Sequence, residues 1–401
     1  MLEGTKVVDL TGTVPGAFAT KQLADFGAEV VKIESPLGGD PVRRLPPYRH
    51  DGGDASLRSA FFSYLSTNKK SIALDVAAPS GFAIVSRLVE SADIVVDTFT
   101  SRVAGQLGIT YEALKDLNPD IIYASITPFG RTGPYSEWRS CELTLYGMGG
   151  EMYSTGIPER EPLKMAGSVA EIESGAVAAV AILGALVART TGLGGDSLDI
   201  SCYEVQMSGI DRRSSALLGF QYTGEITPRR IGWSAGGFPA GVYPCQDGYF
   251  EISAGPPFWS RAVEMMGNPA ELLDPRWTEP GANANPALKE EFDEIFLTWA
   301  LSRTRREIWE AAQAAHVFVG PLNSIQDVTD DDHFRERGAF VEVEDAGGRL
   351  KMPGRPYLFT EGGWSLLHPA PRLGEHTDEV LKELAIPTRD ADILRNAGVI
   401  L

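Results

Sequence analysis

The feature that most constrains the fold is the alternation of strand-like and helix-like segments in the first 130 residues. Strand-like runs occupy residues 6–10, 29–34, 92–99 and 120–127, and helix-like segments occupy residues 16–26 and 80–91. This βαβ order predicts a parallel sheet covered by helices, that is, an α/β fold. Because such sheets bind ligands beyond the carboxyl ends of their strands, we expect a site among the loops at 11–16, 35–44, 99–102 and 128–134.

The rest of the chain changes character near residue 225. An apolar run at 176–188 predicts a buried helix and, at 13 residues, is too short for a bilayer, which takes about 20. A strand at 197–201 and a helix toward 220 follow it. Beyond residue 225 we expect a hairpin at 241–252 and helices over 258–315. The chain then continues with an acidic turn at 327–332, a second hairpin at 339–352 and a helix ending near 384. We expect a large α/β body, a second lobe, and a C-terminus that returns to the body.

Composition excludes several classes of function. The chain has 36 Lys and Arg against 54 Asp and Glu, a net charge of −18, so neither a nucleic acid nor an anionic membrane is an expected partner. The three cysteines have no CxxC spacing and the five histidines are scattered, so no metal site is expected. The N-terminus fits neither a signal nor a transit peptide, and we expect a cytoplasmic protein.

Two carboxylates precede the apolar helix and allow two interpretations. Glu171 and Glu173 lie in the segment KMAGSVAEIESG. Acidic residues there are common as caps that complement the helix dipole. The start of a buried helix can also hold a nucleophilic carboxylate at a cleft, near backbone N–H groups that receive developing charge. The residues alone leave both interpretations open.

Several segments, taken in order, resemble the family III CoA-transferases, which include formyl-CoA transferase and carnitine CoA-transferase and are related to alpha-methylacyl-CoA racemase. They are VVDLTGTVPGAFATKQLADFGAEVVKIESPLGGDPVR, NKKSIALD, LGITYEALKDLNPDIIYASITPFGRTGPY, TGLGGDSLDIS and LGEHTDEVLKEL. Each segment alone is a weak signal. Their order and spacing over nearly the whole chain make the resemblance strong.

The resemblance implies a fold, an assembly and an activity. It implies a Rossmann-like large domain built from both chain ends plus a smaller α+β domain, in an interlocked, ring-like homodimer. The implied bounds are 1–200 for the CoA-binding domain, 201–224 for a linker, 225–325 for the small domain, and 326–401 for a linker and the return. The implied activity moves CoA from an acyl-CoA to a free carboxylic acid through an acyl intermediate on a carboxylate.

The resemblance also assigns site residues. The family's nucleophilic Asp falls on Glu171, which is longer by one methylene, and Gly175 matches the following glycine. The CoA contacts fall on Val14, Pro15, Leu74, Asp75, Thr98, Phe99, Arg139, Cys141 and Glu142, and the substrate loop falls on Gly236 and Gly237. CoA is then a substrate, with no permanently bound cofactor. Arg139, Lys69 and Lys70 are expected to supply local positive charge for the polyanionic CoA.

Two alternatives remain beside the transferase. A racemase needs a His and an acid on opposite faces of the substrate, but Cys141 stands at the His position. The chain could also be a CoA-binding subunit of a heteromeric CoA-transferase, because some members pair with a chain that lacks the usual Asp. The altered nucleophile and an altered CoA loop, with Pro15-Gly16-Ala17 in place of the family's usual Ala-Gly-Pro, point in that direction.

Overall fold

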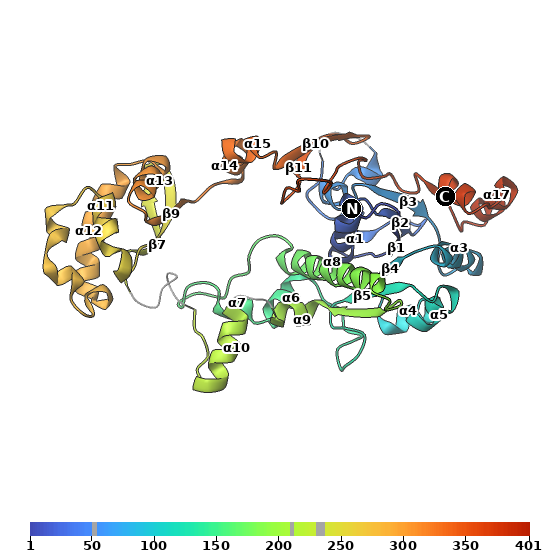
Figure 1. Cartoon of the computed structure of the whole chain (residues 1–401), viewed down its shortest axis with the longest axis horizontal. Coiled ribbons are helices and arrows are strands. Elements are labelled where there is room, and N and C mark those ends of the chain that lie inside the picture. Colours follow the sequence, from blue (N-terminus) through green and yellow to red (C-terminus); the bar gives the residue numbers. More distant parts are fainter. Residues whose placement is uncertain (50–53, 209–211, 230–236) are drawn as a thin grey trace. The chain divides into compact units, whose positions relative to one another are not determined.

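The alternating segments form a six-stranded sheet in the computed structural model, which describes residues 1–49, 54–208, 212–229 and 237–401 (Figure 1). The strands are β1 (Lys6–Leu10), β2 (Glu29–Glu34), β3 (Lys69–Ala73), β4 (Ile94–Asp97), β5 (Ile122–Thr127) and β6 (Ser197–Ser201). Their order is β3-β2-β1-β4-β5-β6, and every neighbouring pair is parallel. The predicted α/β fold with a parallel sheet is confirmed.

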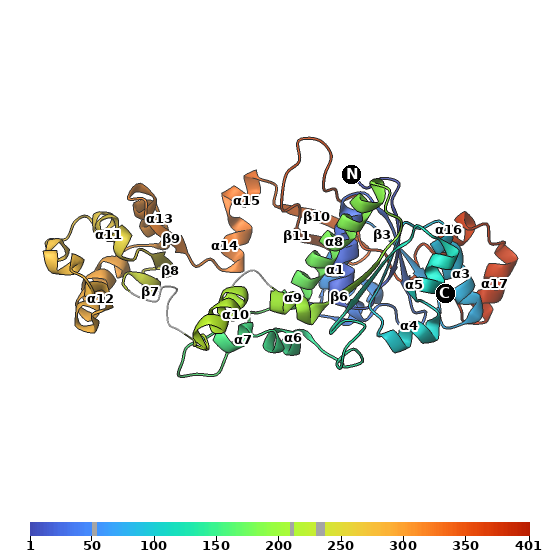
Figure 2. The same cartoon turned by 60° about the horizontal axis from the view of Figure 1, so that its bottom comes forward.

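Helices cover both faces of this sheet (Figure 2). Val7 and Val30 face the helices α1 (Val14–Asp25) and α8 (Val169–Thr190), together with α6 (Glu142–Met148) and α9 (Cys202–Ser208). Val8 and Val31 face the opposite way. That side is covered by α3 (Pro79–Glu90), α5 (Tyr111–Leu117), α16 (Thr377–Glu383) and α17 (Thr388–Asn396). The alternation follows from the two-residue repeat of a strand, and both faces are apolar because both are covered.

The chain divides into two compact units. Unit 1 comprises Met1–Tyr153, Lys164–Thr227 and Arg335–Leu401, and unit 2 comprises Ser154–Leu163 and Pro228–Phe334. Unit 1 also contains α2 (Ala60–Leu65), α4 (Ser101–Leu107), α7 (Glu151–Ser154, which ends at the boundary), α10 (Arg212–Thr223) and the hairpin β10 (Phe340–Asp345) with β11 (Gly348–Pro353). The C-terminal segment returns to unit 1, where the Trp364 indole N–H donates to Asp25 at 2.8 Å.

Unit 2 is built on a three-stranded antiparallel sheet. Its strands are β7 (Ala240–Cys245), β8 (Gly248–Ser253) and β9 (Phe318–Pro321), in that order. Its larger helices are α11 (Trp259–Met265), α12 (Pro286–Leu301) and α13 (Arg305–Ala314). The predicted hairpin over 241–252 is confirmed. The predicted acidic turn over 327–332 is wrong: α14 (Ile325–Asp330) and α15 (Asp332–Glu336) occupy it, and α14 begins with a capping box between Ser324 and Asp327.

Helix α8 differs from the prediction in its length and burial. The predicted buried helix extends to 22 residues, and within the described residues it is the one helix long and apolar enough to cross a membrane. Core helices of other proteins have the same length and apolar composition. Ala178 and Ile182 pack into unit 1, but Val180 and Val187 are 69% and 64% exposed on the opposite face. The prediction of a buried helix therefore holds for one face of α8 and not for the opposite face.

Candidate active site

A pocket opens at the carboxyl edge of the sheet, where the strand order reverses between β1 and β4. Its volume of about 370 Å³ lies within the usual range of small-molecule pockets. Its walls come from the segments that follow β1, β2, β3 and β4. Four of the predicted CoA contacts belong to this lining, namely Leu74, Asp75, Thr98 and Phe99. The structure thus brings together residues from two separate loops at the place where parallel sheets bind ligands.

The loop between β1 and α1 is held against the end of β4. The Gly12 N–H donates to the Thr98 hydroxyl at 3.0 Å. A Cβ on Gly16 would lie 2.5 Å from the Cβ of Thr11, so this close approach needs glycine. Val14 and Pro15, two further predicted contacts, form the first turn of α1 and are buried. The loop places the start of α1 beside the pocket lining.

Glu171 lies in the first turn of α8, which packs against the first turn of α1. A Cβ on Gly175, one turn after Glu171, would lie 2.5 Å from the Pro15 carbonyl oxygen. Ile172 packs against the apolar cluster that contains Val14. The missing side chain of Gly175 therefore allows the two helices to meet. This contact places the first turn of α8, which carries the half-buried Glu171, against the start of α1.

Glu142 caps the first turn of α8 from a different helix. Its carboxylate accepts the backbone N–H groups of Ala170 at 3.2 Å and Glu171 at 3.0 Å. Lys164 pairs with Glu142 at 2.8 Å and donates to the Gly167 carbonyl oxygen at 2.6 Å. A carboxylate here satisfies unpaired N–H groups and complements the helix dipole. The sequence does not reveal this role of Lys164, because it depends on the tertiary contact between α6 and α8.

The surroundings of Glu171 change its acidity. Burial raises the pKa of Glu171, and the Glu142 carboxylate adds to this rise, while the Ser168 hydroxyl and Lys164 oppose it. Desolvation together with a second carboxylate is a typical cause of a raised carboxyl pKa at functional sites. Once ionised, such a carboxylate is more basic than an exposed one. Glu171 therefore has the chemistry of a nucleophile or base.

Two cysteines lie near Glu171. Hydrogen bonds from Thr144 lower the pKa of the exposed Cys141 thiol at the start of α6. Burial raises the pKa of Cys202 to about 11. The negative charge of Glu171 acts to raise the pKa of both thiols. Cys141, Glu142 and Glu171, which were predicted from distant parts of the sequence, thus share one neighbourhood.

The predicted source of positive charge is only partly available. Arg139 is exposed just before α6. Lys69 is 2% exposed and pairs with Asp9 at 3.2 Å. Lys70 pairs at 2.9–3.0 Å with Glu29, Glu379 and Glu383. The expectation that Lys69 and Lys70 supply local positive charge for CoA is wrong, because carboxylates of this chain already neutralise both lysines.

Arg131 organises the loop after β5 and was also missed. Its guanidinium donates to both oxygens of Asp97 at 2.8 Å and to the Ser125 hydroxyl at 2.6 Å. Its backbone N–H donates to Asp199. Gly130, with φ of +80°, makes the turn that permits this geometry. The glycine was a visible signal for the turn, but the partners of Arg131 come from three different strands.

The substrate loop stays a prediction. Gly236 lies outside the described residues. Gly237 belongs to unit 2, whereas Glu171 belongs to unit 1. Gly237 has φ of +130°, and a Cβ there would lie 2.4 Å from the Asn283 amide nitrogen. Glycine is thus required at 237 by both conformation and space.

Comparison with known proteins gives one consistent result. A family model described as CoA-transferase family III matches residues 2–377. A succinate–glutarate CoA-transferase of Agrobacterium fabrum is 32% identical, with 97% of each chain covered. The BbsE subunit of a succinyl-CoA:(R)-benzylsuccinate CoA-transferase of Thauera aromatica is 30% identical, covering 98% of this chain and 97% of its own. The solved structure of a CAIB/BAIF family protein from Brucella suis aligns with a TM-score of 0.85 at 29% identity, covering 96% of this chain and 99% of its own.

Proposed function

Because the chain belongs to CoA-transferase family III, we propose that Glu171 carries the reaction as its nucleophile. The protein is an enzyme that moves CoA from an acyl-CoA thioester to a carboxylic acid. Such an exchange is easier in steps than in one displacement, since a covalent intermediate divides one high barrier into smaller ones. The position and chemistry of Glu171 meet the requirements of that intermediate.

The proposed reaction begins at the thioester carbonyl carbon. A Glu171 oxygen attacks this carbon, the C–S bond breaks, and CoA leaves as a thiolate while a mixed anhydride forms. The thiolate then attacks the Glu171 carbonyl carbon, which releases the donor acid and leaves a glutamyl-CoA thioester. The acceptor carboxylate attacks this thioester, which frees the CoA thiolate and forms a second mixed anhydride. The thiolate then attacks the acceptor's acyl carbon in this anhydride. Acyl-CoA leaves and the Glu171 carboxylate is restored.

The observation that carries this proposal is the contact between the first turns of α1 and α8. It holds a half-buried carboxylate with a raised pKa beside the β1–α1 loop. Glu142 and Lys164 hold the backbone of the same turn from the other side. A reacting group must be fixed in this way, since a displacement of about 1 Å can lower a rate about 10²-fold.

We place CoA between the pocket and Glu171. The lining residues Leu74, Asp75, Thr98 and Phe99 then contact the nucleotide part, and Val14 and Pro15 lie along the path toward Glu171. Within the described part of the chain, no side chain caps α1. Pro15 has no backbone N–H, and the Ala17 N–H donates to the Thr13 carbonyl oxygen, so the N–H groups of Val14 and Gly16 remain for the thioester oxygen or a phosphate. Arg139, Cys141 and Glu142 border the acyl end, and Gly236 and Gly237 stay the substrate loop that the family resemblance assigns.

We infer succinyl-CoA as the donor and a small carboxylic acid as the acceptor. Two relatives that match almost the whole chain carry succinate or succinyl-CoA in their names. The other acids in those names, glutarate and (R)-benzylsuccinate, are also dicarboxylates. A panel of dicarboxylic acids is therefore the first set to test.

We propose that the enzyme is an interlocked homodimer in the cytoplasm, with domain bounds as implied by the family resemblance. Large apolar side chains are exposed on two helices of unit 1: Val177, Val180 and Val187 on α8, and Leu217, Leu218, Phe220 and Tyr222 on α10. Exposed apolar patches of this kind are typical of protein interfaces. All three cysteines are free, which fits a reducing compartment.

A heteromer is the second candidate assembly. One matching relative is named as a subunit, BbsE. In a heteromer, this chain alone would have low activity and would gain activity with a second related chain. Mass photometry of the purified chain, together with its specific activity, separates the two assemblies.

The test of Glu171 uses the purified chain with succinyl-CoA and the dicarboxylic acid panel. We expect Glu171→Gln to abolish transfer and to remove the acyl-enzyme adduct, which hydroxylamine traps on the peptide containing residue 171. Glu173→Gln is the matched control, because Glu173 lies two residues away and accepts a 2.7 Å hydrogen bond from Gln206. Unchanged turnover in Glu171→Gln would exclude Glu171 as the nucleophile.

A further inference from the structure

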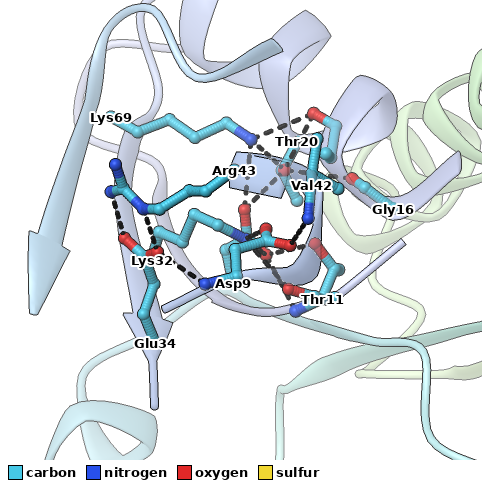
Figure 3. A network of polar contacts seen from close by, with 12 residues as sticks. Asp9, Thr11, Gly16, Thr20, Lys32, Glu34, Val42, Arg43 and Lys69 are labelled. Carbon is cyan, nitrogen blue, oxygen red and sulfur yellow. Dashed lines mark hydrogen bonds and ion pairs between the residues drawn. The ribbon is translucent and has the colours of Figure 1, made fainter. Parts of the chain in front are cut away.

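A cluster of buried charges lies beneath the β1–α1 loop (Figure 3). This buried charge cluster contains Asp9, Lys32, Glu34, Asp40, Arg43 and Lys69, each between 0% and 5% exposed. Three cations face three carboxylates, so the charges balance. Transfer of charges from water to a protein interior is unfavourable, and apolar residues are often as stabilising in such places. The cluster therefore calls for a role beyond stability.

Asp9 joins the β1–α1 loop to α1. One carboxylate oxygen accepts the Thr11 backbone N–H at 2.9 Å and the Thr11 hydroxyl at 2.7 Å. The other oxygen accepts the Thr20 hydroxyl at 2.6 Å and the Lys69 ammonium at 3.2 Å. A single buried carboxylate thus fixes the two ends of the segment that contains Val14 and Pro15.

The two lysines hold the same segment by its carbonyl groups. Lys69 donates to the Ala17 carbonyl oxygen at 3.0 Å and to the Thr20 hydroxyl at 2.7 Å. Lys32 donates to the Thr11 carbonyl oxygen at 2.9 Å and pairs with Asp40 at 2.6 Å. Hydrogen bonds from charged groups are stronger and more directional than neutral ones. The loop and the first turn of α1 are therefore held from below at several points.

The remaining members extend this hold to the loop after β2. Arg43 forms two hydrogen bonds with Glu34, at 2.6 and 2.7 Å, and Glu34 accepts the Asp40 backbone N–H at 2.9 Å. Asp40 accepts the Val42 N–H at 2.8 Å. Val42 packs in the same apolar cluster as Val14 and Ile172. The charges and the contacts of α8 thus converge on the start of α1 from opposite sides.

We propose that the buried charge cluster positions Glu171 for catalysis by fixing the first turn of α1, with Lys69 as its central positioning residue. The chain of contacts runs from Lys69 and Asp9 to α1, and from α1 through Gly175 and Ile172 to the first turn of α8. The inference rests on the proposed role of Glu171. Release of this hold lets Glu171 move relative to the thioester, so the cluster acts on turnover rather than on affinity.

The test compares two buried lysines: Lys69, which donates to the start of α1, and Lys21, which lies within α1 near its end. Lys69→Met removes the hold on the first turns of α1. Lys21→Met is the matched control, because Lys21 is 3% exposed and pairs with Asp25 at 2.7 Å at the other end of the helix. We expect Lys69→Met to lower kcat about 10²-fold with KM for acyl-CoA within about threefold. Lys21→Met lowers Tm to a similar degree but leaves kcat within about threefold.

A second pair of variants, at Thr20, tests the proposal in case Lys69→Met does not fold. Thr20→Val keeps the shape of Thr20 but removes the hydroxyl that joins Asp9, Lys69 and the Gly16 carbonyl oxygen. Thr20→Ser keeps that hydroxyl. We expect Thr20→Val to lower kcat about 10-fold and Thr20→Ser to retain it, with both folded by circular dichroism. Equal kcat in the two variants would overturn the proposal.

The adduct on Glu171 distinguishes failure of the proposed nucleophile from failure of the positioning role of the buried charge cluster. If the wild-type enzyme forms no adduct at residue 171, the proposed nucleophile is wrong, and the inference falls with it. If the wild type forms the adduct and Lys69→Met forms it at the same rate, only the inference is overturned. If both lysine variants lose kcat in parallel with Tm, the cluster is a general stabiliser and not a positioning device.

Discussion

The interior beside the proposed site of unit 1 differs in chemistry from the core of unit 2. In unit 1, the interior beneath the pocket contains six charged groups joined by hydrogen bonds. In unit 2, the core is aromatic, with rings stacked, tilted or edge-on at centroid distances of 5.1–6.5 Å among Phe238, Trp259, Trp277, Phe292 and Phe296. Hydrogen bonds between charged groups fix distances and directions, whereas an aromatic core mainly fills volume. The charged interior lies next to the proposed site, where geometry decides the rate.

The largest effect is expected from Asp9→Asn, which changes charge but almost no volume. Burial by itself raises the pKa of Asp9, but Lys32 and Lys69 more than offset this and hold it well below its usual range. The variant leaves excess positive charge in the interior, so we expect the free energy of unfolding to fall by about 3–5 kcal/mol. Urea denaturation measures it.

A double variant shows whether charge is the cause. Asp9→Asn combined with Lys69→Met removes the excess charge, so we expect part of the lost stability to return. Stability should recover while kcat stays low, because the hold on α1 is still missing. A double variant that loses the sum of the two single effects would show that charge balance is unimportant here.

In unit 2, we expect volume rather than polarity to decide stability. Phe296 is 0% exposed and contacts Tyr243, Phe250, Phe292 and Trp299. Phe296→Ala should lower the free energy of unfolding by about 3–5 kcal/mol, because it leaves a cavity. Phe296→Leu, which keeps most of the volume, should lose less. Tryptophan fluorescence during urea denaturation monitors this core, and an equal loss in both variants would contradict the volume argument.

The contact between α1 and α8 at Gly175 should have an intermediate effect on stability and turnover. Gly175→Ala places a Cβ 2.5 Å from the Pro15 carbonyl oxygen, so α1 and α8 must separate. We expect a loss of about 1–3 kcal/mol in unfolding free energy, as for other overpacked sites, together with a lower kcat. Gly184→Ala on the same helix is the control: its Cβ meets nothing within 4 Å, and Ala favours the helix by about 0.5–1 kcal/mol. A Gly175→Ala enzyme with wild-type kcat would show that this contact does not position Glu171.

The sequence predicted the sheet more fully than the site. Strands β1 and β2 and the hairpin of unit 2 follow from local β propensity and turn residues, so they could be predicted. Strand β3 could not, because it begins with Lys69 and Lys70, and a buried lysine breaks the apolar pattern of a covered strand. Its burial depends on Asp9, which lies 60 residues earlier in the chain.

The site shows the same limit. The resemblance predicts Glu171 as the nucleophile and matches Gly175, and the structure supplies a reason for the glycine in its contact with Pro15. The cap of α8 by Glu142 and the role of Lys164 required the tertiary contact between α6 and α8. Local pattern describes single helices and strands; partners that are distant in sequence are determined only when those elements pack.

The smallest effect concerns His376, whose neutral form joins the C-terminal segment to β3. The Ser71 backbone N–H donates to the Nδ1 of His376 at 3.2 Å, so this nitrogen must be unprotonated. Burial lowers the pKa of His376, and Lys70 and His368 add to this, while Glu375 and Glu379 oppose it. The unfolded chain therefore binds a proton more readily than the folded one below its ordinary pKa of about 6.5.

The contribution of His376 to the free energy of unfolding should consequently be fully present above pH 6.5. It should decline as the pH falls through the lower pKa of the folded protein. One titrating proton can change the free energy of unfolding by at most about 1.4 kcal/mol per pH unit, and the slope caused by His376 should stay below this limit. Urea denaturation between pH 7.5 and 5.5 measures the slope. His376→Gln should flatten that slope, because the group that titrates is gone, whereas His333→Gln, at an exposed position, should leave it unchanged. A slope that persists in His376→Gln would assign the pH dependence to other groups and leave the attachment of the C-terminal segment insensitive to pH.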